Sequence, residues 1–78
     1  MKFQDDKSLY GTIGRNIKSY RLQSGLTQSQ LADKIGISIS YLTKIEAEKC
    51  NKSISLSILN NIANSLNVEI TEFFKETD

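Results

Sequence analysis

A single glycine, Gly36, divides the stretch TQSQLADKIGISISYLTKIE (residues 27–46) into two short amphipathic segments. A helix that stops here usually needs a positive φ angle, which glycine adopts at no steric cost. Apolar residues recur at helical spacing on both sides of the glycine, at Leu31, Ala32 and Ile35 before it and at Ile37, Tyr41, Leu42 and Ile45 after it. The pattern predicts two short helices joined by a tight turn, which is a helix-turn-helix.

Both of these helices carry a start signal. Thr27 is followed three residues later by Gln30, which is the spacing of a capping box. Ser38 is a suitable N-cap for the next helix, because its hydroxyl can accept a hydrogen bond from a free backbone N–H. Two helices are therefore expected at residues 28–35 and 39–48.

The rest of the chain continues the helical period. Ser55 is a candidate cap for a helix carrying Leu59 and Ile62, and Thr71 for a last short helix. Absence of proline and a size suited to one core argue for a single all-α domain. The path and length of the loop at 49–55 stay open. The expected elements are an N-terminal tail at 1–8, helices at 9–24, 28–35, 39–48, 56–66 and 71–75, and a C-terminal tail at 76–78.

Composition argues against several classes of function. With no histidine and a lone Cys50, neither an internal disulfide nor a metal site is expected. No nucleophile–base pair and no glycine-rich phosphate loop can be found, so the chain is not expected to be an enzyme and no cofactor is expected. No apolar run approaches membrane-spanning length and no apolar leader follows Met1, so no membrane contact and a cytoplasmic location are expected.

The charge is unevenly distributed. The net charge is only +1, but residues 7–52 hold eight basic and three acidic side chains, a net of +5. Residues 53–78 hold one basic and four acidic side chains, a net of −3. Such polarity suits a molecule that turns one face toward phosphate groups. The alternative is that a short chain acquires this asymmetry by chance.

The motifs Gly25-Leu26-Thr27-Gln28, Leu31-Ala32, Gly36, Ser40-Tyr41-Leu42 and Ile45-Glu46 stand in one register. In this register the chain, over about residues 13–74, resembles the Cro/CI-type (XRE) helix-turn-helix regulators, and small stand-alone regulators such as restriction-modification controller proteins in particular. The resemblance implies a compact five-helix, lambda-repressor-like DNA-binding domain at 9–75. It also implies a transcriptional regulator, a repressor that can control its own gene, reading double-stranded DNA through the major groove. The alternative is an antitoxin-type protein that binds a partner protein as well as DNA.

Base contacts are expected from the helix that starts at Ser38, on the side away from Leu42 and Ile45. Lysine can donate to guanine, serine can pair with several bases, and an exposed isoleucine can pack on a thymine methyl group. The alternatives are that Ile39 packs against the preceding helix and that Lys44 is solvated or contacts phosphate. The candidate base contacts are Ile39, Ser40, Thr43 and Lys44.

Phosphate contacts are expected at helix N-termini, where free backbone N–H groups favour anions. The resemblance adds a second group, in the loop before the fourth helix. Ordinary solvation is the alternative for Lys49 and Lys52. The candidates are Thr27, Gln28, Ser29, Ser38, Tyr41, Lys49, Asn51 and Lys52.

Two further sets complete the predictions. Arg21 and Glu46 fall on inward-facing positions, where each would be costly to bury alone, so the two are expected to form an ion pair, as the resemblance also implies. The alternative is that Arg21 contacts DNA. Apolar residues near the C-terminus exceed what one small core needs. One of the two adjacent phenylalanines is expected to complete the core and the other, with Ile70 or Val68, to pack across a homodimer axis. The alternative is that both are buried in the monomer and that any dimer forms only on DNA. The candidate dimer residues are Val68, Ile70, Phe73 and Phe74.

Overall fold

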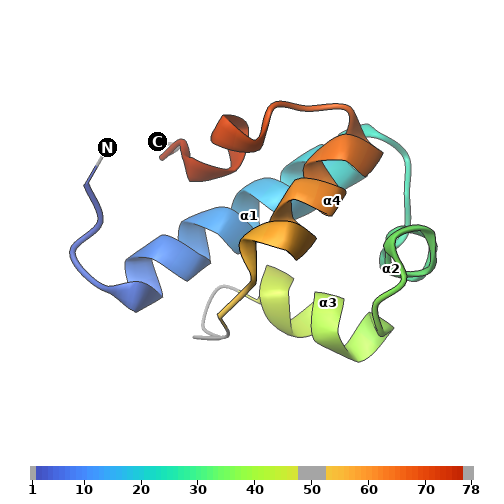
Figure 1. The fold of residues 1–78 in the computed structure, drawn as a ribbon, viewed down its shortest axis with the longest axis horizontal. Helices are drawn as coiled ribbons and strands as arrows, with labels where there is room; N and C mark the ends of the chain where they lie inside the picture. The colour runs from blue at the N-terminus through green and yellow to red at the C-terminus, as the bar shows by residue number, and fades with distance from the viewer. Residues whose placement is uncertain (1, 48–52, 77–78) are drawn as a thin grey trace.

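The computed structural model describes residues 2–47 and 53–76, and within these ranges the chain is all-helical (Figure 1). This confirms the predicted fold class, with one difference: the last element is a 3-10 helix rather than an α-helix. The elements in order are α1 (Asp6–Gln23), α2 (Gln28–Ile35), α3 (Ile39–Glu46), α4 (Leu56–Leu66) and the 3-10 helix η1 (Ile70–Phe74).

Three elements have boundaries that differ from those expected: α1 spans Asp6–Gln23 rather than 9–24, α3 ends at Glu46 rather than at 48, and η1 spans Ile70–Phe74 rather than 71–75. The helix α1 begins at Asp6 rather than at residue 9, because the carboxylate of Asp5 accepts the backbone N–H of Ser8 at 2.8 Å. Residues 6–8 therefore belong to the helix and not to the tail. The helix α3 ends two residues before 48, because Ala47 is extended (φ −76°, ψ 120°). Finally, η1 begins at Ile70 without a side-chain cap, so Thr71 does not cap it.

The turn between α2 and α3 follows from its capping residues. Thr27 and Gln30 form a complete capping box, and the hydroxyl of Ser38 accepts the backbone N–H of Tyr41 at 3.0 Å. Gly36 adopts the left-handed conformation (φ 78°, ψ 33°) that the end of α2 requires. The three residues after α2 can then reverse the chain, so that α3 packs on α2.

The core is a single cluster to which every element contributes. In the view of Figure 1, α1 runs across the back and α4 crosses in front of it. The helix α1 contacts α3, α4 and η1, while α2 contacts α3 and α4. Each fully buried large apolar side chain contributes roughly 1.5–3 kcal/mol to folding by leaving water. The largest fully buried side chains are Ile17, Leu31, Leu42, Leu59, Ile62 and Phe73.

The crossing of α1 over α3 depends on Gly14. A Cβ atom at this position would lie 2.1 Å from the backbone oxygen of Ile45, well inside van der Waals contact. Glycine thus lets the two helix backbones approach closely, although it weakens α1 by about 1 kcal/mol relative to alanine. In the part of the chain that the structure describes, no helix is long and apolar enough to cross a bilayer.

Candidate nucleic-acid interface

The helix α3 has one buried and one exposed side. Leu42, Ile45 and Glu46 are buried against the rest of the domain. On the other side lie the four residues predicted to contact bases, and half of the surface of Ile39 is open to solvent (51%). Helical spacing places these four on one face. The exposed residues are Ile39, Ser40, Thr43 and Lys44.

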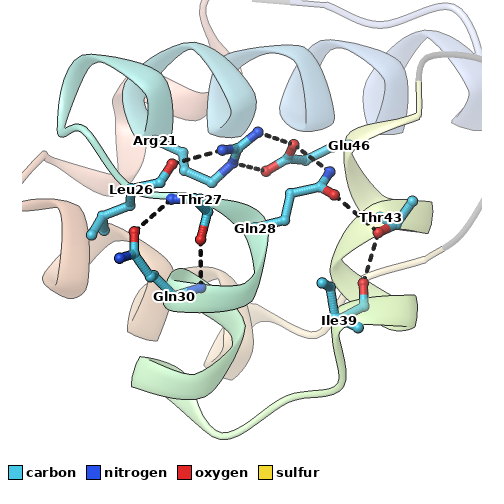
Figure 2. A network of polar contacts seen from close by, with 8 residues as sticks. All are labelled: Arg21, Leu26, Thr27, Gln28, Gln30, Ile39, Thr43 and Glu46. Atoms are coloured by element: carbon cyan, nitrogen blue, oxygen red, sulfur yellow. Dashed lines mark hydrogen bonds and ion pairs between the residues drawn. The ribbon is translucent and has the colours of Figure 1, made fainter.

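The buried side of α3 is fixed to α1 by an ion pair. The guanidinium of Arg21 donates from Nε to Glu46 Oε2 at 2.7 Å and from Nη2 to Oε1 at 2.9 Å (Figure 2). Its Nη1 also donates to the backbone oxygen of Leu26 at 2.7 Å, in the loop before α2. Both charged residues are only 5% exposed. The expected pair is thus present as a two-point contact, the geometry that arginine's planar fork favours.

A residue of α2, Gln28, connects the Arg21–Glu46 pair to the exposed side of α3. Gln28 donates from Nε2 to Glu46 Oε1 at 3.0 Å, and its Oε1 lies 3.2 Å from the hydroxyl of Thr43 (Figure 2). The same hydroxyl lies 2.8 Å from the backbone oxygen of Ile39. Because a hydroxyl has one proton, Thr43 donates to one of these oxygens at a time. The network links α1, α2 and α3, so it sets the orientation in which α3 presents its exposed face.

The predicted phosphate contacts fall into two groups. The first group lies on α2 and α3: Thr27 and Ser38 are their N-caps, and Ser29 is exposed in the first turn of α2. Gln28 and Tyr41 are half-buried, and Gln28 is held by Glu46 and Thr43. The other group lies outside the described residues, and consists of Lys49, Asn51 and Lys52.

Comparison with known proteins agrees with this geometry. The helix-turn-helix family model matches residues 17–73, which is more than half of the chain. The chain belongs to the XRE-type helix-turn-helix family.

Individual relatives are regulators. The chain is 40% identical over 65 residues to the immunity repressor protein of Bacillus phage phi105, a match that covers 83% of this chain and 44% of the repressor. Among solved structures, SinR, the master regulator for biofilm formation, in complex with DNA aligns with a TM-score of 0.74 and 33% identity, over 81% of this chain and 98% of that one. The restriction-modification controller protein C.AhdI from Aeromonas hydrophila aligns with a TM-score of 0.75 and 28% identity, over 83% and 96%. The chain spans less than half of the phage repressor's length.

The structure of this helix-turn-helix domain also reveals a residue that the sequence analysis did not single out. Asn16, on α1, is buried and donates from Nδ2 to the backbone oxygens of Phe73 and Lys75, both at 2.8 Å. A polar residue three positions after Ile13, on the inner stripe of α1, was the available signal. Its partners are backbone oxygens, which carry no sequence signature.

The candidate dimer residues separate into two kinds. Phe73 is completely buried in the core, so it is removed from the candidate dimer surface. Val68, Ile70 and Phe74 are half-buried at the edge of the core. Val68 and Ile70 line a shallow hollow of about 350 Å³ between η1 and the exposed side of α4. The structure therefore leaves Val68, Ile70 and Phe74 as surface candidates.

Proposed function

We propose that this protein is a sequence-specific double-stranded DNA-binding repressor of transcription, with α3 as its recognition helix. The observation that carries this proposal is the two-sided character of α3. Its inner side is fixed by the Arg21–Glu46 pair, while its outer side offers polar and apolar groups to solvent. A helix held in this way can enter a major groove with a defined register. The phage immunity repressor and the DNA-bound SinR structure among the relatives support it.

Each exposed side chain of α3 suits a particular base edge. Lys44 can donate to guanine O6 and N7, Ser40 can donate or accept, and Ile39 can pack on a thymine methyl group. Thr43 is more restricted, because its hydroxyl proton is engaged by Gln28 or by the backbone oxygen of Ile39. We therefore assign Thr43 a role as an acceptor or as a methyl contact, and as the residue that orients Gln28.

Phosphate contacts would come from the first turns of α2 and α3. The hydroxyl oxygens of Thr27 and Ser38 accept backbone N–H groups, so their protons remain available for a phosphate. Gln28 uses one of its two amide protons on Glu46, and the second can donate outward. Such contacts fix the position of the protein on DNA without reading sequence. Candidates of the same kind are Ser29, Tyr41, Lys49, Asn51 and Lys52.

We further propose that the protein acts as a homodimer, in the cytoplasm, and represses its own gene among its targets. One recognition helix reads too few base pairs to select one site in a genome. A two-fold pair of helices would read two half-sites about 34 Å apart. A dimer placed on a promoter would block access to it, which requires no catalytic activity.

The surface proposed for this dimer is α4 with Val68, Ile70 and Phe74. No residue from 53 to 68 carries a charge, and the hollow beside α4 is lined by Asn60, Asn64 and other uncharged groups, with Glu69 as its one charged member. In a two-fold interface each patch meets its own copy, so like charges would repel. A nearly uncharged face with half-buried apolar residues therefore suits a second copy of this chain.

The decisive experiment is a binding series on DNA from immediately upstream of the protein's own gene. Footprinting should locate a two-fold symmetric site, and affinity should fall steeply with salt. Lys44→Ala should then cost roughly 1–3 kcal/mol on this site and relax the preference at one base pair. The matched control is Lys18→Ala, which removes the same charge from the exposed side of α1.

Two results would contradict the assignment. If Lys44→Ala weakened binding to every sequence by the same factor, Lys44 would be a phosphate contact only. If sedimentation equilibrium at micromolar concentration gave a monomer, and a half-site bound as tightly as the full site, the homodimer would be wrong.

A further inference from the structure

The element η1 is too short to form more than a few hydrogen bonds within itself. It is a 3-10 helix of five residues, followed at once by extended backbone at Lys75. At its two ends, the backbone N–H of Glu72 donates to the backbone oxygen of Glu69 at 3.0 Å, and the backbone N–H of Lys75 donates to the backbone oxygen of Glu72 at 3.4 Å. A turn this short does not persist in water unless other parts of the protein hold it. The position of η1 must therefore be set by what it packs against.

The helix α1 holds η1 in place through hydrogen bonds. Asn16 directs both protons of its amide nitrogen at η1, one to the oxygen of Phe73 and one to the oxygen of Lys75. One oxygen lies just before the last residue of η1 and the other just after it. A single side chain therefore fixes both how closely η1 packs on α1 and the direction in which its backbone runs. Asn16 lies between Gly14 and Arg21, two of the α1 residues that contact α3, but its side chain donates to the C-terminal segment.

A second α1 residue contacts η1 one turn later. The hydroxyl of Tyr20 donates to Glu72 Oε1 at 2.8 Å, and its ring meets Phe73 edge-to-face with centroids 6.2 Å apart. Burial of Phe73 then keeps η1 attached to the core. Attachment alone does not fix the direction of the backbone, because an aromatic ring can tilt within its pocket. The bonds from Asn16 supply that direction.

We propose that Asn16 is a positioning residue for self-association: its amide holds η1 where a second copy docks. This inference rests on the homodimer proposed above, since Ile70 and Phe74, two of the surface candidates, lie within η1. Asn16 does not reach the partner. It acts through η1, and the DNA-facing network of Arg21, Gln28 and Glu46 does not include it.

The effect of Asn16→Ala on the dimer dissociation constant is amplified because both copies in the dimer carry the substitution. A dissociation constant rises as the inverse of the fraction of molecules in the competent state. Both copies must present η1 correctly, so the dimer dissociation constant rises as the inverse square of that fraction. If Asn16→Ala left about one molecule in three with η1 in place, the dimer constant would rise about ninefold.

The experiment compares self-association with DNA binding in the same variants. Asn16→Ala removes both donors, and Asn16→Asp also places a carboxylate opposite two carbonyl oxygens, so its effect should be larger. Tyr20→Phe removes only the bond to Glu72. Gln23→Ala is the matched control, because Gln23 is exposed on α1 and its amide donates to Ser19 at 3.1 Å. Sedimentation equilibrium gives the dimer constant, and titrations of one half-site and of the full site give the two affinities.

We expect Asn16→Ala to raise the dimer dissociation constant about tenfold, with half-site affinity unchanged within about twofold and full-site affinity lowered. Tyr20→Phe should shift the dimer constant about threefold in the same direction, and Gln23→Ala not at all. A folded Asn16→Ala protein with an unchanged dimer constant would overturn the proposal. So would equal losses of half-site and full-site affinity, since these would indicate a general loss of structure.

If Asn16→Ala does not fold, Asn16→Ser decides, because serine keeps one donor but cannot bond both oxygens at once, and an unchanged dimer constant in that variant would overturn the proposal. A wild-type protein that stays monomeric and binds a half-site as tightly as the full site would instead contradict the homodimer itself. The failure of the role given to Asn16 and the failure of the proposed function are therefore distinguishable.

Discussion

The helix α1 holds two parts of the molecule in two different ways. Toward α3 it uses a buried ion pair, Arg21 with Glu46, and a backbone approach that only Gly14 allows. Toward η1 it uses a neutral amide, Asn16, and a partly buried contact between Tyr20 and Glu72 at the edge of the core. Buried charges bind only in a narrow geometry and are costly to leave alone, whereas neutral and partly exposed contacts can be lost at modest cost.

This difference matches what each part is proposed to do. A recognition helix has to keep its register on DNA, and a displacement of the order of 1 Å would misalign its hydrogen bonds with the bases. A self-association surface tolerates more adjustment, since apolar packing is not directional. We therefore expect variants on the α3 side to change stability and DNA affinity together. Variants on the η1 side should change self-association with smaller effects on stability.

The largest effect is expected from breaking the buried pair. Glu46→Ala leaves the guanidinium of Arg21 without its carboxylate and removes the acceptor used by Gln28. The loss should be roughly 3–5 kcal/mol of unfolding free energy, measured by urea denaturation.

The matched variant for this test replaces the whole pair, as Arg21→Met with Glu46→Leu. Because no uncompensated charge then remains, its stability should lie closer to wild type than that of Glu46→Ala. A Glu46→Ala protein as stable as wild type would show that the pair has no role in fixing α3.

A smaller effect is expected at the helix crossing. In Gly14→Ala the new Cβ would meet a backbone oxygen of α3, which cannot rotate away, so α3 must move. Overpacking costs about 1–3 kcal/mol, and better helix propensity returns roughly 1 kcal/mol, so a net loss is expected. Urea denaturation measures this loss, and half-site affinity should fall with it. Lys18→Ala, on the exposed side of α1, should change neither, and a stabilised Gly14→Ala protein would contradict the close approach.

Features that depend on neighbouring residues were readable from the sequence. The capping box at Thr27 and Gln30, the cap at Ser38 and the turn at Gly36 are local, so spacing alone reveals them. The pairing of Arg21 with Glu46 could be expected because two opposite charges at buried positions need each other.

Other features depend on contacts that the spacing of residues along the sequence does not reveal. Asn16 bonds to backbone oxygens 57 and 59 residues away, which any residue type could supply. Phe73 and Phe74 are adjacent on a five-residue element, so periodicity could not tell which one enters the core. The N-cap at Asp5 was missed because Gly11 and Gly14 lower the helix propensity of this segment. This reduction is larger than the gain expected from one N-cap.

The smallest effect is expected from the partly exposed contact that joins Glu72 to Lys75 and Tyr20. The ammonium of Lys75, 2.6 Å from Glu72 Oε2, together with the hydroxyl of Tyr20, lowers the pKa of Glu72 below its ordinary value of 4.5. A lowered carboxyl pKa contributes stability above the ordinary value, and this is lost as pH falls through the folded-state pKa. The bond to Glu72 raises the pKa values of both Lys75 and Tyr20, so their contributions are lost only as pH rises through those raised values.

Urea midpoints of wild type and Glu72→Gln should therefore differ slightly at neutral pH and converge as pH falls from about 7 to about 3. The contact is partly exposed, so this difference should also shrink at about 1 M salt, where charges are screened within about 3 Å. The Glu46→Ala loss should persist at the same salt concentration, because buried pairs are screened much less. If the Glu72→Gln difference stayed constant with pH and with salt, the contact of Glu72 would behave like the buried pair of Arg21 and Glu46. The proposed difference between the α3 side and the η1 side of α1 would then be wrong.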